Sequence, residues 1–439
     1  MDLPILKQGQ KRVVIIGAGF GGIRLAQRLS PKLFQVILID RNNYHQFQPL
    51  LYQVATSGLE PSSISFPLRK IFQDNKNVFI RIAEALKIDR ESQLVNTSIG
   101  DIPYDYLVLA QGATTNYFNN MRIQEHAYPM KSVSESLLLR NTLLQNYEKS
   151  LIAQTNEEKE ALLNVVIVGG GPTGVELAGA IAEMKKNILP KDYSEINFKQ
   201  MKICQIEASP RLLGALSKKS AERVRNYLTK LDVEVLTDTS VIDYDGTTVV
   251  LNNGDKLVSN CLIWAAGVKG FSFEGMPEQV QAPNGRLKVN GFSQLEGNEN
   301  IFVIGDAAIM SSPSLPKGHP QVAPVAIQQA TLLAKNLECI VKSQPMESFE
   351  YHNKGSMATV GRNKAVAEIG KIRLTGFFAW LTWMAVHLMS IIGVKNRLVV
   401  LLNWMWQYFT YDQSLRLIIK AEEKKIAGNT SKNTAGMPV

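Results

Sequence analysis

The chain has few cysteines, and those it has are poorly placed for chemistry. Its three cysteines, Cys204, Cys261 and Cys339, lie far apart and form no CxxC or CxxxxC motif. This spacing argues against a dithiol active site and a disulfide scaffold, and it is typical of a reducing compartment. The first twelve residues (MDLPILKQGQKR) contain no apolar run of the kind that a signal peptide requires.

Acidic residues are also in the minority, since 39 Asp and Glu face 48 Lys and Arg and the net charge is +9. Such a balance suits an anionic membrane surface or nucleic acid. The sequence has no nucleic-acid-binding motif and no metal-ligand motif, so we expect neither partner and favour a membrane. A length of 439 residues predicts two or three domains, and a hydrophobic content of 45% is typical of a large globular core.

Two glycine-rich patterns, about 150 residues apart, are the most informative feature that is present. Each follows an apolar run that is typical of a buried parallel strand. Three glycines in each pattern allow a tight turn, a close approach of the backbone to a pyrophosphate, and close packing of the next helix. The helix N-terminus would then face the phosphates. The two glycine sets are Gly17, Gly19 and Gly22, then Gly169, Gly171 and Gly174.

An acidic residue ends the second strand of each predicted unit. Asp40 ends the run 35–40, and Glu207 ends the run 201–207. In dinucleotide-binding folds an acid at this point binds the ribose hydroxyls. The longer gap before Glu207 predicts an inserted loop over residues 185–199. Two complete units indicate two dinucleotides on one polypeptide, in practice a flavin and a nicotinamide.

The order of the segments predicts an α/β fold of two nested Rossmann-type domains. After the second unit the chain returns to a strand at 301–304, so the second domain is inserted into the first. We expect a discontinuous FAD-binding domain (1–130 and 271–345), an NADH-binding domain (131–270), a C-terminal membrane-anchoring region (346–420) and a disordered tail (421–439). Residues 131–155 are expected to form a helix, and another is expected from about 321 to 340.

Short motifs resemble those of the flavin disulfide-reductase superfamily. Gly305-Asp306-Ala307-Ala308 resembles its second flavin motif, in which the acid holds the ribityl hydroxyls. Ala110-Gln111-Gly112 and Ala265-Ala266-Gly267 resemble its two linking strands. Within the superfamily, the chain resembles type II NADH dehydrogenases over about residues 11–420. Longer strings carry that resemblance: NYHQFQPLLYQVAT (43–56), GPTGVELAG (171–179), EASPRLL (207–213) and YHNKGSMATVGRNKAV (351–366).

The resemblance implies FAD and NADH as cofactors, a membrane quinone as electron acceptor, and no proton pumping. It places Gln111 and Asp306 against FAD and Gly267 in the NADH site. It places Glu176 near both rings as a catalytic residue, either to position NADH or to relay protons. Glu207 should favour NADH by repelling the 2′-phosphate of NADPH.

The quinone-site motif of the family is altered in this chain. The family carries Ala-Gln, three residues, then Gln on one helix. Here Pro324 stands at the first Gln position, Gln328 keeps the second, and Gln321 and Gln329 lie nearby. We assign these four residues to the quinone site, with Gln328 as a catalytic residue. His45 could reach the same site, although a single histidine is more often structural.

The C-terminal region carries an uncharged run of eighteen residues, 377–394, with cations on both sides. Four of the five tryptophans lie between residues 380 and 406. This pattern is typical of helices that lie in a membrane surface. The predicted attachment is monotopic, on the cytoplasmic face, and a homodimer is possible. A packed helical pair and a true spanning helix are the alternatives, because eighteen residues are the lower limit for crossing a bilayer.

These features together predict a non-electrogenic NADH:quinone oxidoreductase. Three alternatives stay open. A sulfide:quinone oxidoreductase would need a cysteine pair beside the flavin, and the second complete glycine pattern opposes it. A soluble NADH oxidase and an NADH-sensing flavoprotein are the other two.

Overall fold

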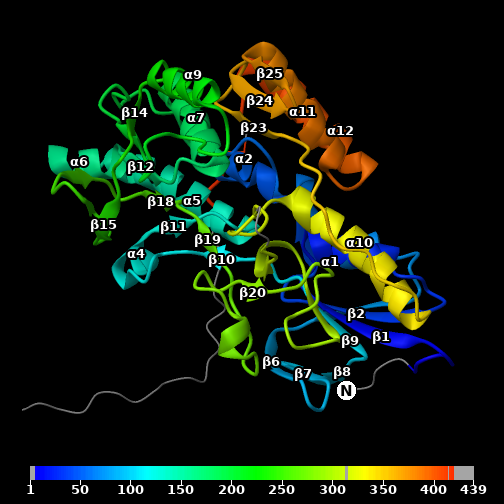
Figure 1. Ribbon diagram of the computed structural model, residues 1–439. Helices are drawn as coiled ribbons and strands as arrows, with labels where there is room; N and C mark the ends of the chain where they lie inside the picture. Colours follow the sequence, from blue (N-terminus) through cyan, green and yellow to red (C-terminus); the bar gives the residue numbers. More distant parts are fainter. Residues whose placement is uncertain (1–4, 312–314, 414, 420–439) are drawn as a thin grey trace, which may run out of the picture.

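Two parallel five-stranded sheets form the frame of the protein in a computed structural model, which describes residues 5–311, 315–413 and 415–419 (Figure 1). The first sheet has the order β21-β9-β1-β2-β5: Ile301–Val303, Tyr106–Leu109, Lys11–Ile16, Phe34–Asp40 and Val78–Ile82. The second has the order β11-β18-β12-β13-β14: Tyr128–Pro129, Leu262–Trp264, Val165–Val168, Ile203–Ile206 and Val233–Leu236. The predicted α/β class with two Rossmann-type units is therefore confirmed.

The first sheet is buried on both faces, which explains why its strands are continuous apolar runs. Alternate residues of β1 point to opposite sides. Val13 and Ile15 pack with helices α1 (Phe20–Arg28) and α10 (Ala323–Val341), whereas Val14 and Ile16 pack under the antiparallel strands β6–β8. The strands of that meander are Ala85–Asp89, Leu94–Thr97 and Gly100–Pro103.

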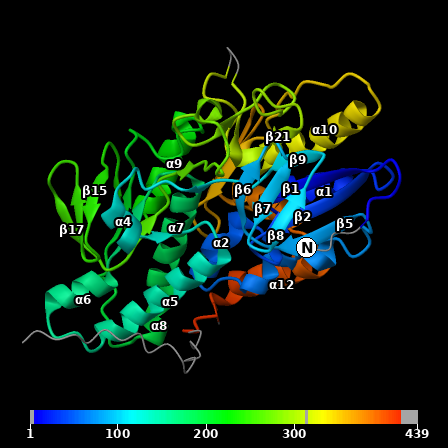
Figure 2. The ribbon, with the colours of Figure 1, turned by 90° about the horizontal axis from the view of Figure 1, so that it is seen from below.

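The second sheet has the same construction. One face packs against helices α5 (Val133–Ser150), α7 (Pro172–Asn187) and α9 (Lys218–Thr229). The other face packs against a second antiparallel meander, β15–β17: Val241–Tyr244, Thr248–Leu251 and Lys256–Val258. The two sheets with their layers form two halves that lie side by side (Figure 2). Strands β10 (Thr114–Thr115) and β19 (Val268–Lys269) pair where the chain passes between them.

The helices begin where local chemistry lets them begin. Ser132 and Glu135 form a capping box at the start of α5, which occupies most of the predicted segment 131–155. Thr155 caps α6 (Asn156–Leu163), and Ser217 caps α9. The prediction of a loop over 185–199 was wrong in part. Helix α7 continues to Asn187 because its last turns remain apolar on one side, and a short α8 follows (Leu189–Asp192).

Short elements bridge the first glycine turn and the second sheet. Helix α2 (Leu51–Ala55) packs on both α5 and α7, so the segment after Asp40 reaches into the other half (Figure 1). The remaining elements of this bridge are β3, η1, η2, β4 and α3: Tyr44–Gln46, Gln48–Leu50, Pro61–Ser63, Ser65–Pro67 and Leu68–Ile71. Elsewhere lie α4, η3, β20, η4 and β22: Met121–His126, Glu278–Val280, Leu287–Lys288, Gly305–Ala307 and Ala308–Ile309.

The C-terminal region is a small antiparallel sheet followed by two helices. The strands β23–β25 are Ser356–Thr359, Ala365–Ile369 and Ile372–Thr375, and the helices are α11 (Phe377–Ser390) and α12 (Val394–Thr410). The uncharged run 377–394 therefore does not form one helix, because α11 ends at Ser390 and α12 begins at Val394, the last residue of the run. Gly393 has φ +84°, and a Cβ there would meet the ring of Phe66 at 2.6 Å, so the chain turns sharply at this point.

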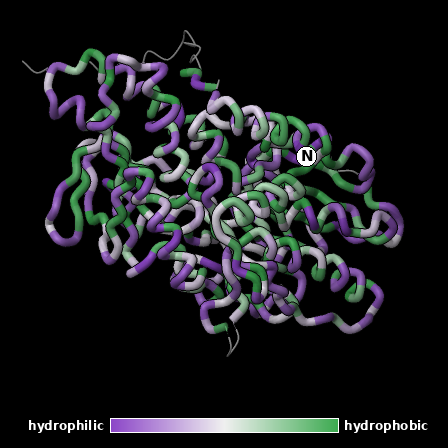
Figure 3. Tube along the Cα trace, turned by 90° about the horizontal axis from the view of Figure 1, so that it is seen from above, coloured by the Kyte–Doolittle hydropathy of each residue, from purple (hydrophilic) through white to green (hydrophobic). Residues whose placement is uncertain are grey.

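Helices α11 and α12 lie on one side of the molecule (Figures 1 and 3). Figure 3 views the protein from that side. None of the helices that the structure describes has both the length and the apolar content required to cross a membrane. The predicted tail 421–439 lies outside the described residues.

Candidate active site

The first glycine turn has the geometry that a pyrophosphate requires. Gly17 has φ +104°, and a Cβ on it would lie 2.4 Å from the carbonyl oxygen of Ala110. A Cβ on Gly22 would lie 1.9 Å from the carbonyl oxygen of Gly17, so only glycine lets α1 pack this closely. A Cβ on Gly19 would meet no described atom within 4 Å. Gly19 therefore borders open space at the N-terminus of α1, where a phosphate can approach the backbone.

Asp40 ends β2 beside this turn. Its carboxylate accepts hydrogen bonds from the backbone N–H groups of Ala18 (2.7 Å) and Asn42 (2.7 Å). Burial raises the pKa of Asp40, and the backbone donors oppose that shift. The acid is thus fixed at the mouth of the turn, where it can accept a ribose hydroxyl, as predicted for the flavin nucleotide.

The second glycine turn repeats this geometry. Gly169 has φ +113° and approaches the carbonyl oxygen of Ala265, while a Cβ on Gly174 would lie 2.0 Å from the carbonyl oxygen of Gly169. Gly171 borders open space. Glu207 ends β13 and accepts hydrogen bonds from the N–H groups of Gly170 (2.5 Å) and Ser209 (2.7 Å). Gly267, with φ +129°, follows the segment that closes on Gly169.

Polar side chains gather where the first sheet ends. The buried Gln111 Oε1 has no hydrogen-bond partner within the described part of the chain, and the Asp306 carboxylate and the Lys131 ammonium attract each other nearby. Burial raises the pKa of Asp306 and lowers that of Lys131, while their attraction opposes both shifts. Buried polar groups normally have partners, so this set fits a polyhydroxylated ligand such as the ribityl chain of FAD.

Three of the four residues predicted for the quinone site form hydrogen bonds with backbone groups near Asp306 and α10. Gln321 Nε2 donates to the carbonyl oxygen of Asp306 (3.1 Å), and Gln329 Oε1 accepts from the N–H of Gly305 (2.7 Å). Gln329 is only 2% exposed, so it is not part of a solvated helix face. Gln328 exchanges two hydrogen bonds, each of 3.0 Å, with the backbone of His352.

Pro324 lies in the first turn of α10, following the cap residue Val322. Proline is favoured at this position because its missing N–H would have no partner within the helix. Proline at this position is therefore compatible with the helix, and α10 forms as predicted. The change from Gln to Pro removes the side-chain amide that the family pattern places here.

Glu176 lies on α7 and is only 6% exposed. Its Oε1 accepts hydrogen bonds from the indole N–H of Trp383 (3.0 Å) and from the backbone N–H of Thr359 (3.4 Å). Burial raises the pKa of Glu176 to about 8, and the two donors oppose the shift. At neutral pH this carboxyl is therefore mostly protonated. Its partners belong to the C-terminal region, which the sequence did not predict.

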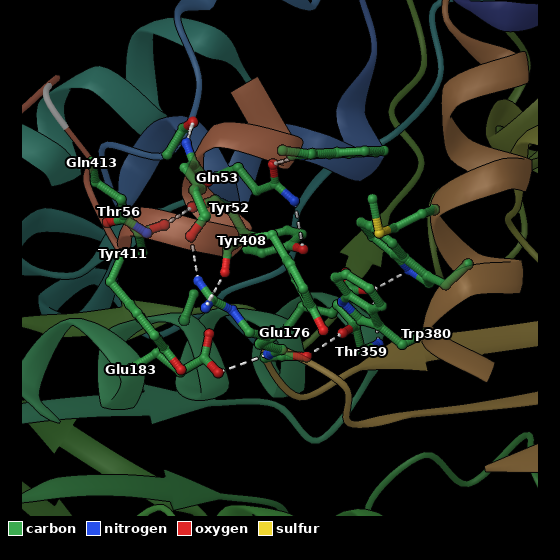
Figure 4. Close-up of a pocket in the computed structure, with 18 of the residues that line it drawn as sticks. Tyr52, Gln53, Thr56, Glu176, Glu183, Thr359, Trp380, Tyr408, Tyr411 and Gln413 are labelled. Carbon is green, nitrogen blue, oxygen red and sulfur yellow. Dashed lines mark hydrogen bonds between the residues drawn. The ribbon is translucent and has the colours of Figure 1, made fainter. Parts of the chain in front are cut away.

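A cavity of about 110 Å³ opens beside Glu176 (Figure 4). Helices α2, α7, α11 and α12 and the turn after β23 supply its walls. Figure 4 shows Glu176 and Glu183 on the same face of α7, two turns apart, with Tyr52 beside them. Burial raises the pKa of Glu183, and the backbone N–H of Arg362 donates to it (2.7 Å). The cavity combines aromatic walls with two carboxyl groups of raised pKa.

His45 and the cysteines have structural surroundings. His45 is buried, its Nδ1 lies 3.1 Å from the carbonyl oxygen of Ala18, and burial lowers its pKa. Cys204 and Cys261 are buried in the second half, where burial raises the pKa of each thiol to about 12. Such thiols are unreactive at neutral pH. The three free cysteines provide no redox pair of the kind that a sulfide oxidase would need.

Sequence reasoning missed several residues of the site. Lys131 precedes the cap of α5 and carries no local signal of a ligand. Trp383 was recognised only as one of the tryptophans of a membrane-surface helix. Tyr52 lies within the resembling string 43–56, and that string was the only available clue to its position in the cavity wall.

Comparison with known proteins places this geometry in a family. The chain matches the model of the pyridine nucleotide-disulphide oxidoreductases over residues 11–330 and that of the NDH2 C-terminal domain over residues 353–411. A type II NADH:quinone oxidoreductase of Mycobacterium tuberculosis is 36% identical, with 90% of this chain and 87% of that protein covered. One from Haemophilus influenzae is 29% identical, with 91% and 98% covered.

A solved structure shares the fold. The structure of NDH2 from Plasmodium falciparum in complex with NADH superposes with a TM-score of 0.85 and 24% identity. The match covers 94% of this chain and all of that one (100%).

Proposed function

We infer that this chain, which belongs to the pyridine nucleotide-disulphide oxidoreductase family and within it to the type II NADH:quinone oxidoreductases, oxidises NADH and reduces a quinone without pumping protons. The observation that carries this inference is the pair of glycine turns, each at the end of a parallel strand and each with an acid on the next strand. We assign residues 1–130 and 271–345 to FAD, 131–270 to NADH and 346–420 to the membrane.

The FAD site that we propose uses the first turn, with Gly17, Gly19 and Gly22 around the pyrophosphate and Asp40 on the ribose. Gln111 and Asp306 would hold the ribityl chain and the ring, because the buried Gln111 Oε1 lacks a partner within the described residues and the Asp306 carboxylate can accept hydroxyl groups. Bound FAD supplies the chemistry of accepting a hydride from NADH and giving two electrons to a quinone. The Lys131 ammonium, which attracts Asp306, would add a positive charge to this site and favour a reduced, anionic flavin.

The NADH site that we propose uses Gly169, Gly171, Gly174 and Gly267. Glu207 would accept the hydroxyls of the adenosine ribose. Because the carboxylate already faces two backbone donors, it is held in place and would repel a 2′-phosphate.

We assign to Glu176 the role of holding one proton for the reduction of quinone. A pKa of about 8 keeps its carboxyl protonated at neutral pH, and that proton can be given to a quinone oxygen as charge develops there. Desolvation around Glu176 keeps the proton in place until that transfer, since the neutral acid is easier to bury than the carboxylate.

The quinone site assigned from the family pattern would lie beside α10. Gln321 and Gln329 would support the site by holding the backbone of Gly305 and Asp306, and Gln328 would support it by fixing residue 352. Among the four residues assigned from the family pattern, Pro324 offers no hydrogen bond. We therefore expect quinone to depend less on side-chain amides here than in relatives that carry both glutamines.

Attachment to a lipid bilayer through α11 and α12 is part of the proposal. Large apolar side chains cover their outer faces: Phe377, Phe378, Leu381, Val386, Met389, Val394, Leu398, Leu402, Met405, Trp406 and Phe409. Polar Asn396 and Gln407 turn inward instead and donate to backbone carbonyls of the protein body. Apolar side chains outside and polar side chains inside are the reverse of the pattern on a water-exposed helix, and they suit a lipid surface. Attachment on the cytoplasmic face and a homodimer stay predictions.

The test is anaerobic reduction of the flavin-loaded protein by NADH, NADPH and sulfide in separate cuvettes, followed by a menaquinone or ubiquinone analogue. We expect the flavin absorbance to bleach with NADH, more slowly with NADPH, and to recover on addition of quinone. Bleaching by sulfide alone would overturn the assignment. Bleaching by NADH without recovery would refute the quinone step and leave the dinucleotide sites standing.

A further inference from the structure

Helix α11 reaches the Glu176 carboxyl group, which lines the cavity. The indole N–H of Trp383 donates to Glu176 Oε1 at 3.0 Å, although 207 residues separate them. Both side chains are buried, with 2% and 6% of their surface exposed. The indole is one of two hydrogen-bond donors to a carboxyl group whose protonation matters in the proposed function, and it comes from a helix whose other face is exposed.

The groups that face Glu176 from each neighbouring element are few. The backbone N–H of Thr359 at the end of β23 is the other donor. From α2 comes the buried hydroxyl of Tyr52, and from α7 the carboxyl of Glu183. The turn after β23 brings Arg362 and Lys364, whose charges act mainly on Glu183. From α11 itself comes His387, which stays neutral because burial lowers its pKa. No cation in this set is bonded to Glu176, so the two N–H donors are what stabilises its charged form.

Packing holds the indole of Trp383 in one orientation. His387 stacks on it with ring centroids 4.1 Å apart and planes at 24°. The Nδ1 of His387 also lies 2.7 Å from the carbonyl oxygen of Trp383. Tyr52 and Trp404 meet the indole at 6.3 Å and 5.8 Å between ring centroids. The N–H direction is therefore set by the position of α11 and not by a free side-chain torsion.

The opposite face of the same helix is exposed and apolar. Phe378 is 70% exposed and Met389 65%, while Ala379 and Trp383 point into the protein. Any contact that shifts α11 toward or away from the protein body will therefore move the indole relative to Glu176. In the proposed function, a lipid surface contacts Phe378 and Met389 and so fixes the position of α11.

We propose that Trp383 is a positioning residue that holds the Glu176 carboxyl, so that the seating of helix α11 governs how readily this carboxyl releases its proton. The proposal rests on the proposed function in one respect, namely that Glu176 serves quinone reduction. It adds that the membrane-facing helix is an electrostatic part of the reaction site and not only an anchor.

The experiment compares the flavin-loaded enzyme with its Trp383→Phe variant. The infrared band of the protonated Glu176 carboxyl, identified by its loss in Glu176→Gln, is titrated against pH in the oxidised enzyme without substrate. Loss of a hydrogen bond to a charged group should move the midpoint upward by about one pH unit. The alkaline limb of NADH:quinone activity should move in the same direction. Trp404→Phe is the matched control, because that indole donates to Gln53 and not to Glu176.

A second variant separates the hydrogen bond from the packing. Replacing Trp383 by 3-benzothienyl-alanine keeps the shape of the indole but removes its N–H, and it should reproduce the upward shift with full flavin content. An unchanged midpoint in both Trp383 variants, or an equal shift in Trp404→Phe, would overturn the proposal. Because the infrared titration needs no turnover, it decides this point even if quinone reduction were refuted.

Discussion

Replacement of Glu176 by Gln should stabilise the protein, and increasingly so as the pH rises. The pKa of Glu176 is raised from 4.5 to about 8 by burial. Between these values the native state binds more protons than the unfolded state, so the free energy of unfolding falls as pH increases. Each pKa unit corresponds to about 1.4 kcal/mol. The wild type therefore loses about 3 kcal/mol of unfolding free energy by pH 7 and about 5 kcal/mol above pH 8, relative to low pH.

Gln is well suited to this test, because its side-chain oxygen can still accept from Trp383 and Thr359 while the charge is gone. The measurement is the thermal unfolding temperature of both proteins from pH 5 to pH 9. The unfolding temperature of the variant should exceed that of the wild type by a margin that grows up to about pH 8 and stays constant above that pH.

The matched control is Glu160→Gln on α6. Lys202 lowers the pKa of Glu160, so this carboxylate contributes stability above its unfolded pKa that is lost as pH falls. The control should therefore show a small effect of opposite sign, since the ion pair is exposed. A difference between Glu176→Gln and wild type that does not vary with pH would refute the reasoning, because it would mean that Glu176 titrates normally.

Three further predictions follow from the geometry of the sites. Gly19→Ala should fold with unchanged stability but lose its flavin, whereas Gly22→Ala should destabilise the protein, because only the second Cβ meets the chain itself; flavin content and unfolding temperature distinguish them. Glu207→Gln should raise the ratio of kcat/KM for NADPH over NADH roughly tenfold by removing charge repulsion, while Glu234→Gln on β14 should not. Phe378→Lys and Phe409→Lys should each weaken binding to lipid vesicles by roughly ten- to a hundredfold, as expected for loss of one buried phenylalanine, whereas Ile152→Lys, equally exposed beyond α5, should have no effect. Equal vesicle binding by all three Lys variants would rule out α11 and α12 as the attachment surface.

The dinucleotide turns could be predicted because their chemistry is local. A glycine that must adopt positive φ, or that must let a helix approach, is visible in the sequence as a glycine at fixed spacing from an apolar strand. The position of the acidic residue that follows each turn is set by the combined length of one helix and one strand. The buried strands before the glycine turns could also be predicted, because strands buried on both faces are apolar throughout.

The residues predicted for the quinone site show where such reasoning ends. The spacing in α10 identified Gln321, Gln328 and Gln329 but could not tell which way their amides point. In the folded chain all three bind backbone groups that come from residues outside the helix or at its entrance. A side chain with two donors and an acceptor finds whichever backbone lies nearest, and only the packed structure decides which backbone that is.

The sequence by itself determined the two dinucleotide turns, their acids, the α/β class and the apolar character of the last helices. It did so because these depend on backbone conformation and on the spacing of neighbouring residues. The tertiary structure alone decided that the uncharged run would break at Gly393 and that Trp383 would meet Glu176 across 207 residues. The raised pKa of Glu176 is also a tertiary property, because burial by segments distant in the sequence creates it, and no local pattern records which distant segments will enclose a carboxyl group.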